Sequence, residues 1–184
     1  MHYWSVENPH WLHEVEHQRQ WSINVWCGKV GDQLVGPHFF EGKLNGPRYR
    51  EFLETDLPFL LENVPLAVRQ QMWFQHDGCP AHYSGVAREV LDRDYNGRWI
   101  GREGPVNWPA RSPDLTSPDF FLWGYLKNKV YETAPTSRED MMQKIINACA
   151  SITPDMLISC VRSFEVRINK CIEVQGYQFE HLLK

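Results

Sequence analysis

The fold of this chain is decided by two stretches of sequence, Gln75-His-Asp-Gly-Cys-Pro-Ala-His82 and Trp108-Pro-Ala-Arg-Ser-Pro-Asp-Leu-Thr-Ser-Pro-Asp119. In the first stretch, Asp77 ends an apolar run and is followed by a glycine and a proline. In the second, Asp119 follows a proline and opens a helical pattern. Because side chains at a strand end and at a helix start can point away from the backbone, we expect the two carboxylates to converge on one ligand.

The two aspartates suit a hard divalent cation. Mg²⁺ is held by one or two protein carboxylates together with water and phosphate, and two such ions about 3.5–4 Å apart stabilise the attacking and leaving oxygens of an in-line displacement. Gly78 admits close backbone approach beside Asp77, and Pro80 stiffens the exit. The helix dipole is expected to keep Asp119 ionised. We therefore predict that Asp77 and Asp119 are catalytic metal ligands in phosphodiester chemistry.

Ordinary structural roles compete with this interpretation. An Asp-Gly pair is most often a plain turn, and an aspartate after proline at a helix start is most often a cap. His76 and His82 flank Asp77 and are either further metal ligands or, by the commoner pattern, hydrogen-bonded structural residues. The local sequence leaves these alternatives open.

The second stretch contains another aspartate, five residues before Asp119. Ser112, Pro113 and Asp114 are predicted to form a turn whose carboxylate caps backbone amides. Asp114 is therefore the main competitor to Asp119 for the metal role.

Length and composition indicate one globular domain. The chain has 184 residues, of which 42% are hydrophobic and 23% charged, with eight Trp. No apolar run approaches the length of a membrane span. The first residues carry neither the basic nor the apolar region of a signal peptide.

The charge argues against tight DNA binding by this chain alone, because its net charge is -4. Positive charge is nevertheless enriched locally. Arg98, Arg102 and Arg111 lie between the two acidic motifs against Glu103 alone, and Lys127 follows on the next predicted helix. These side chains are either a nucleic-acid-binding face or an ordinary solvated surface.

The five cysteines are odd in number and scattered, which is typical of free thiols in a reducing compartment. Cys149, Cys160 and Cys171 are spaced by eleven on predicted helices, and we expect core thiols there rather than a zinc site. Cys79 and Ser84 are of a residue type that can act as a nucleophile, but the sequence shows no base with an orienting partner beside them.

Hydrophobic periodicity predicts a mixed α/β sheet flanked by helices. Trp21–Cys27 alternates large apolar and small polar residues, as a strand does, and Leu34–Phe40 is the expected returning strand, with Pro37 at an edge or a bulge. Further strands are expected at 72–76 and 99–100, a long loop at 101–118, and helices that begin near 45, 66, 81, 119, 137 and 153, the first kinked or split at Pro58.

The motifs closely resemble the catalytic domain of Tc1/mariner-type DNA transposases. The resemblance rests on Trp73-Phe-Gln-His-Asp-Gly-Cys-Pro-Ala-His82 combined with the stretch that ends at Asp119. Three shorter segments are similar to versions in insect genomes: Trp26-Cys-Gly28, Gly36-Pro-His-Phe-Phe40 and Arg98-Trp-Ile-Gly-Arg102. The resemblance covers nearly all of the chain, and the combination is more discriminating than either motif alone.

The resemblance implies a ribonuclease-H-like fold with a triad of acidic residues and Mg²⁺ or Mn²⁺, in an enzyme that nicks and joins DNA ends by cut and paste. By motif match, the second acid falls on Asp77 and the third on Asp119, with 41 residues between them (119 − 77 − 1). It also implies DNA as a partner, a homodimer as one arrangement, a nuclear location and no membrane association.

The first acid of the triad has no match here. In the family it lies on a first strand, upstream of the predicted hairpin and central in the sheet. Residues 1–20 contain no Asp, and Glu7, Glu14 and Glu16 lie in polar surroundings. We therefore expect one domain over 1–184 with an irregular remnant at 1–20, truncated before its central strand and its DNA-binding helix-turn-helix region. Such a chain is expected to bind metal weakly and to be inactive alone.

Two other functions remain open from the sequence. A domesticated module would keep the fold and use its basic loop or aromatic surface to bind DNA or protein. A plain structural domain would use its acids as caps.

Overall fold

The computed structural model describes residues 21–108 and 112–183. The expected N-terminal remnant at 1–20 and the candidate residue Arg111 lie outside the described residues.

The expected hairpin is confirmed, with shifted boundaries. Strands β1 (Asn24–Val30) and β2 (Gln33–Phe40) pair antiparallel across a two-residue turn. The register shifts between Trp26 and Gly28, opposite Gly36 and the proline after it. Gly36 has a φ of 100°, a conformation that favours glycine. The bulge predicted at Pro37 is therefore possible because Gly36 can adopt this backbone conformation.

The first helical region is split, as Pro58 predicts. Asn45 caps α1 by accepting a hydrogen bond from the Arg48 amide at 3.1 Å. The helix then widens into a π-helical segment, and α2 begins at Leu57, one residue before Pro58. The segments are α1 (Gly46–Glu51), the π-helical Phe52–Asp56, α2 (Leu57–Leu60) and α3 (Leu66–Gln71).

A second, parallel sheet follows. It consists of β3 (Phe74–Gln75), β4 (Trp99–Gly101) and β5 (Val106–Asn107), with α4 (Gly85–Asp94) between β3 and β4. Two expectations were wrong here. Helix α4 begins four residues after Ala81, because Pro80 and its neighbours form a turn, and the expected loop at 101–118 contains β5, whose two residues are too few to show a strand period.

The C-terminal part is helical and begins with short turns. Its elements are a 3-10 turn (Pro113–Leu115), a π-helical turn (Pro118–Leu122), α5 (Trp123–Val130), α6 (Arg138–Ala150), α7 (Pro154–Glu173) and a final 3-10 turn (Glu180–Leu182). The side chains of Ser137 and Thr153 cap α6 and α7, and Gly176 follows α7 with a φ of 84°. These local signals predicted the two long helices correctly.

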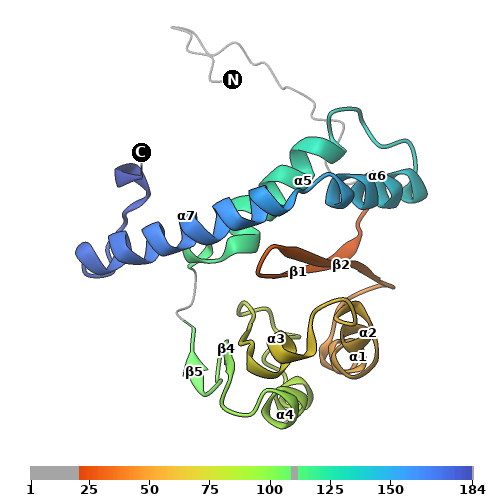
Figure 1. Ribbon diagram of the computed structural model, residues 1–184. Coiled ribbons are helices and arrows are strands. Elements are labelled where there is room, and N and C mark those ends of the chain that lie inside the picture. The colour runs from red at the N-terminus through yellow and green to blue at the C-terminus, as the bar shows by residue number, and fades with distance from the viewer. Residues whose placement is uncertain (1–20, 109–111, 184) are drawn as a thin grey trace, which may run out of the picture.

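The hairpin lies between two helical layers, with α5, α6 and α7 on one side and α1 to α4 with the parallel sheet on the other (Figure 1). Alternate strand residues therefore enter two different cores. Val35 and Phe40 join the core built on Tyr49, Phe52 and Trp99. On the opposite face, β1 and β2 contribute Cys27 and, partly buried, Val25, Leu34 and Phe39 to the core of α5 and α6.

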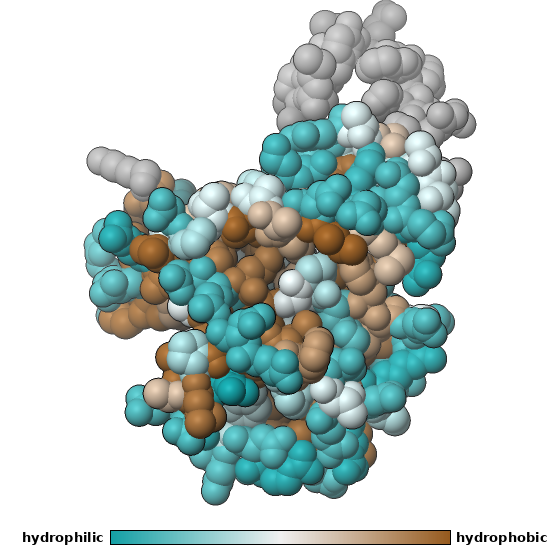
Figure 2. All heavy atoms as spheres, turned by 45° about the vertical axis from the view of Figure 1, so that its right-hand side comes forward, coloured by the Kyte–Doolittle hydropathy of each residue, from teal (hydrophilic) through white to brown (hydrophobic). Residues whose placement is uncertain are grey.

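The two sheets stay separate within 21–108 and 112–183, where no strand joins the hairpin to β3. The expected mixed α/β architecture flanked by helices is confirmed. From one side, apolar residues cross the middle of the surface between hydrophilic areas above and below (Figure 2). In the described residues no single helix has the length and composition of a membrane span, and α6 with α7 reaches them only across a 79° bend.

Candidate functional site

A cavity of about 360 Å³ lies where the two sheets and the helical layer meet. Its walls come from β1, from β3 and the residues after it, from the turn at 116–119, and from α7. Asp77 and Asp119 both line this cavity, and so do His76 and His82. The structure thus brings both candidate carboxylates to the same cavity, although they come from elements far apart in sequence.

Asp77 is held in place by its own loop. Its Oδ1 accepts a hydrogen bond from the Cys79 amide at 3.0 Å and lies 2.6 Å from Nδ1 of His82. The bond to His82, the Cys79 amide and the nearby histidines lower the pKa of the Asp77 carboxyl, against a smaller opposing effect of burial. The side chain is 57% exposed, so an ionised carboxylate faces solvent from a fixed position.

His82 and His76 pack against each other beneath this loop. Their rings stack with centroids 5.3 Å apart, and His82 also packs on the buried Tyr49 ring at 4.4 Å. Burial, with a smaller effect of His82, lowers the pKa of His76 to about 3. The expected hydrogen-bonded role is found for His82, whereas neither ring nitrogen of His76 has a partner among the described residues.

Asp119 lies in the first turn of the helical segment that leads into α5. Its amide donates to the Thr116 carbonyl at 2.8 Å, and Thr116 is buried with its hydroxyl donating to the Ser112 carbonyl. Burial and the charge of Asp77 raise the pKa of Asp119. Desolvation and the neighbouring carboxylate thus act against the helix dipole, which is expected to keep Asp119 ionised.

Asp114 is placed away from Asp77. The predicted turn is the 3-10 segment that starts at Pro113, and Ser112 makes no side-chain cap there. The contact of Asp114 is through its main-chain carbonyl, which accepts from Arg167 at 3.0 Å. Asp114 lines a second cavity, which Asp119 shares and Asp77 does not. The geometry favours Asp119 over Asp114 as the partner of Asp77.

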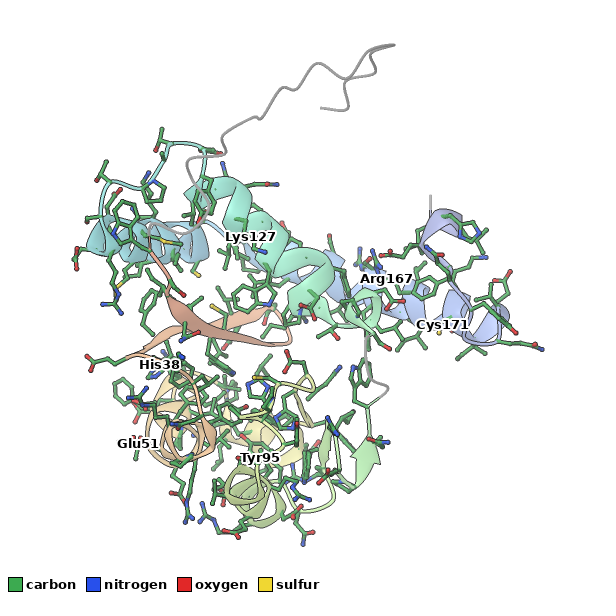
Figure 3. The ribbon with its side chains drawn as sticks, turned by 180° about the vertical axis from the view of Figure 1, so that it is seen from behind. His38, Glu51, Tyr95, Lys127, Arg167 and Cys171 are labelled. Atoms are coloured by element: carbon green, nitrogen blue, oxygen red, sulfur yellow. The ribbon has the colours of Figure 1, made fainter. Side chains whose placement is uncertain are left out.

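The candidate basic residues are not gathered into one face in the described chain. Arg98 donates to the Met72 carbonyl at 2.9 Å, and the Arg102 guanidinium lies 4.2 Å above the Tyr83 ring. Both flank β4, whereas Lys127 lies on α5 in the other layer (Figure 3). Lys127 instead acts on the site, where its charge partly offsets the raised pKa of Asp119.

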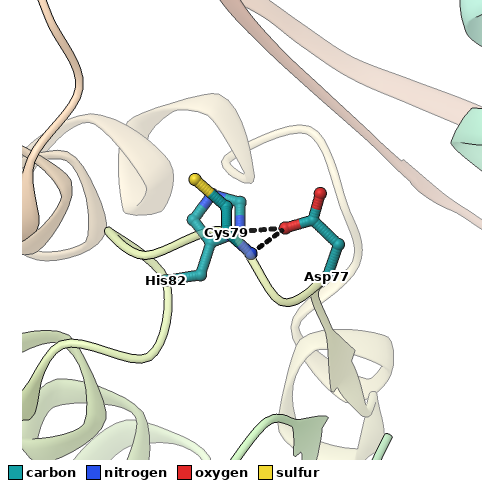
Figure 4. Close-up of side chains that lie close together, drawn as sticks. All are labelled: Asp77, Cys79 and His82. Carbon is teal, nitrogen blue, oxygen red and sulfur yellow. Dashed lines mark hydrogen bonds and ion pairs between the residues drawn. The ribbon is translucent and has the colours of Figure 1, made fainter. Parts of the chain in front are cut away.

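The grouping of Cys79 with Asp77 and His82 was not predicted from the sequence. One ligand atom each from Asp77, Cys79 and His82 lies within 4.8 Å of the others (Figure 4). Gly78 has open space at its Cβ position, and Pro80 occupies the turn between Cys79 and His82. The spacing Asp-x-Cys-x-x-His was the available signal, because a tight turn brings positions three apart together.

Comparison with known proteins gives one sequence relative. The chain is 30% identical over 161 residues to the transposable element Tc3 transposase of Caenorhabditis elegans, which covers 84% of this chain and 44% of that protein. The chain thus spans less than half the length of this curated relative. No protein-family model matches this chain.

The fold matches solved structures of the Mos1 mariner transposase. The Mos1 catalytic domain with raltegravir and Mg superposes with a TM-score of 0.73 at 20% identity, over 86% of this chain and 77% of that one. The Mos1 paired-end complex with Mn gives 0.73 at 18% identity, over 96% of this chain and 51% of that one. The sequence match and the fold together place the chain among the catalytic domains of Tc1/mariner-type transposases.

Proposed function

We propose that this chain is the catalytic-domain portion of a cut-and-paste DNA transposase, in which Asp77 and Asp119 hold Mg²⁺ or Mn²⁺. The observation that carries the proposal is that the two carboxylates line one cavity, where burial and then the charge of Asp77 raise the pKa of Asp119. A divalent cation between them would relieve that repulsion. Mos1 transposase structures with Mg and with Mn support the same choice of ion.

The donor set fits a hard cation at this place. Both side chains offer carboxylate oxygens, the ligands that Mg²⁺ and Mn²⁺ prefer. His82 and the Cys79 amide hold one oxygen of Asp77, and the hydrogen bonds of the described residues leave its second oxygen for a ligand. A bound ion supplies charge stabilisation to the attacking and leaving oxygens of a phosphodiester.

The protein's own part in this proposal is positioning. His82 orients Asp77, and the turn built on buried Thr116 directs Asp119 into the same cavity. The cavity wall is largely apolar and includes Trp26 and Trp123. DNA as partner and a nuclear location follow from this function.

We further propose that these 184 residues alone cleave DNA weakly. Among the described residues that line the cavity, Asp77 and Asp119 are the only carboxylates. Two-metal phosphodiester chemistry uses a bridging carboxylate in addition to ligands such as these two, and a site with fewer oxygens holds Mg²⁺ less tightly.

The test is a metal titration of the purified chain. Millimolar Mg²⁺ or Mn²⁺ should raise the melting temperature, and Asp77→Asn and Asp119→Asn should each abolish that rise. Asp114→Asn is the matched control, because Asp114 is five residues before Asp119 but does not line the cavity that contains both Asp77 and Asp119. This variant should retain the rise in melting temperature with metal.

Cleavage of DNA carrying a transposon end is then measured under the same conditions. Weak Mg²⁺-dependent nicking that Asp77→Asn abolishes supports the proposal, while robust nicking that depends on Asp77 would show that another acid completes the site. If neither metal nor Asp77 matters and DNA still binds with a steep salt dependence, a non-catalytic binding module is the better description.

A further inference from the structure

The loop after β3 presents three different metal-binding side chains to one point. The Oδ1 of Asp77, the thiol of Cys79 and a ring nitrogen of His82 lie within 4.8 Å of one another (Figure 4). The loop is closed by a hydrogen bond from the His82 amide to the Cys79 carbonyl at 2.9 Å. This turn brings the cysteine and the histidine together at the Cys-x-x-His spacing that zinc sites use for paired ligands.

The ligands are held before any metal arrives. The side chain of His82 is only 13% exposed and packs against the rings of Tyr49 and His76. Asp77 is fixed through its bond to the Cys79 amide at 3.0 Å, and Cys79 is a half-buried free thiol. Such support reduces the entropy lost when a metal orders its ligands.

The mixture of ligands selects the kind of metal. A thiolate with an imidazole suits Zn²⁺, whereas Mg²⁺ takes oxygen ligands. Tetrahedral zinc with bond lengths of about 2.0–2.3 Å separates its ligand atoms by about 3.3–3.8 Å. The three ligand atoms lie within 4.8 Å of one another, and zinc binding requires the 2.6 Å contact between Asp77 and His82 to lengthen as the cation replaces the proton they share.

We propose that Asp77, Cys79 and His82 form a binding site for Zn²⁺, or another thiol-binding divalent ion, with a fourth position open to water. The site uses the oxygen of Asp77 that faces His82. Zn²⁺ bound there neutralises the Asp77 carboxylate, so it weakens the binding of Mg²⁺ at the neighbouring cavity. The zinc site itself requires neither Asp119 nor any catalytic activity.

The test uses Co²⁺ as a spectroscopic substitute on the whole chain, with a phosphine reductant that keeps the thiols reduced. One equivalent of Co²⁺ should give the near-ultraviolet charge-transfer band of a cobalt–thiolate bond, and Zn²⁺ should abolish the band by displacement. The band should be lost in Cys79→Ser and weakened in His82→Gln and Asp77→Asn. Circular dichroism of each variant without metal confirms that it is folded.

Two controls separate this proposal from the proposed function. Cys171→Ser removes another half-buried thiol, on α7, and should keep the band. Asp119→Asn should also keep it while losing the Mg²⁺ effect on the melting temperature. Absence of the band in the unaltered chain, or its persistence in folded Cys79→Ser, would overturn the zinc site and leave the Mg²⁺ proposal standing.

Discussion

His76 is buried beside the candidate site, with 7% of its surface exposed and without a hydrogen-bond partner among the described residues. Its ring meets the edge of Trp99 and the face of His82, and a Cβ at Gly101 would collide with it. Burial in this packing, with a smaller effect of His82, disfavours an imidazolium, so the pKa of His76 falls to about 3 from an ordinary 6.5.

The consequence is a loss of stability in acid. Between pH 6.5 and 3 the unfolded chain binds a proton at His76 that the folded chain does not, so the free energy of unfolding falls as the pH falls through this window. The slope from this one group reaches about 1.4 kcal/mol per pH unit. Denaturant unfolding with a metal chelator, from pH 7 to pH 4, should show a shallower decline in His76→Gln.

Asp77 contributes to the same decline, because the pKa of its carboxyl is lower in the folded chain than in the unfolded chain. Its stabilising effect is fully present above the pKa of the unfolded chain and is lost as the pH falls through the pKa of the folded chain. The comparison with His76→Gln separates the two residues. An identical decline in the variant would show that His76 is protonated in the folded chain. Imidazole NMR signals of His76 that stay neutral to pH 4 would support its burial independently.

At the level of single residues, the sequence predicted the positions of Asp77 and Asp119 better than their environments. Their places at a strand end and in a helix's first turn follow from local pattern. The pKa of Asp119 depends on burial and on the charge of Asp77, and the His76–His82 pair packs on Tyr49. These contacts join segments far apart in sequence, so no local pattern encodes them.

The helices are set by local caps, and α6 is the clearest case. The Ser137 hydroxyl accepts from the Asp140 amide at 3.0 Å, and the Asp140 carboxylate accepts from the Thr136 amide at 2.8 Å. These bonds satisfy two amides that no helical carbonyl can reach. Helix α6 in turn covers the hairpin through Ile145 and Cys149.

Replacing Ser137 by Ala should therefore destabilise the whole domain by about 1 kcal/mol, because one helix amide loses its partner. For a chain of this size that corresponds to a fall in Tm of about 2–4 °C. The matched control is Ser159→Ala, at an exposed position inside α7, where alanine favours the helix. Calorimetry that finds equal losses for both variants would contradict the capping role.

The elements that the sequence did not predict lack such local signals. Strand β5 has two residues, and its place is set by parallel pairing with β4. The π-helical turns at Phe52–Asp56 and Pro118–Leu122 arise where helices meet their neighbours in the core. Pairing and packing between distant segments decide these features, whereas capping residues and turn glycines decide the long helices.

The whole molecule is organised by a hairpin with a core on each face (Figure 1). Alternation in β1 and β2 was visible in the sequence, but a single hairpin with two buried faces was not, because each face also carries half-buried residues. Two of the cysteines report on the contact between the hairpin and the helices on one of its faces. Cys27 on the hairpin and Cys149 on α6 have sulfur atoms 4.0 Å apart, and this hydrogen bond with burial raises the pKa of the Cys27 thiol.

Thiol labelling should report this arrangement directly. Cys27, Cys149 and Cys160 are 5%, 5% and 4% exposed and should react with an alkylating reagent only when the layers open, whereas half-buried Cys79 and Cys171 should react first. Each 1.4 kcal/mol of opening free energy slows labelling about tenfold. Peptide mass spectrometry, with a metal chelator present, follows the five sites separately. Cys171→Ser should remove only one fast site, and denaturant should make all five equivalent. If Cys149 were labelled as fast as Cys171, α6 could not be packed on the hairpin, and the two-core architecture would be wrong.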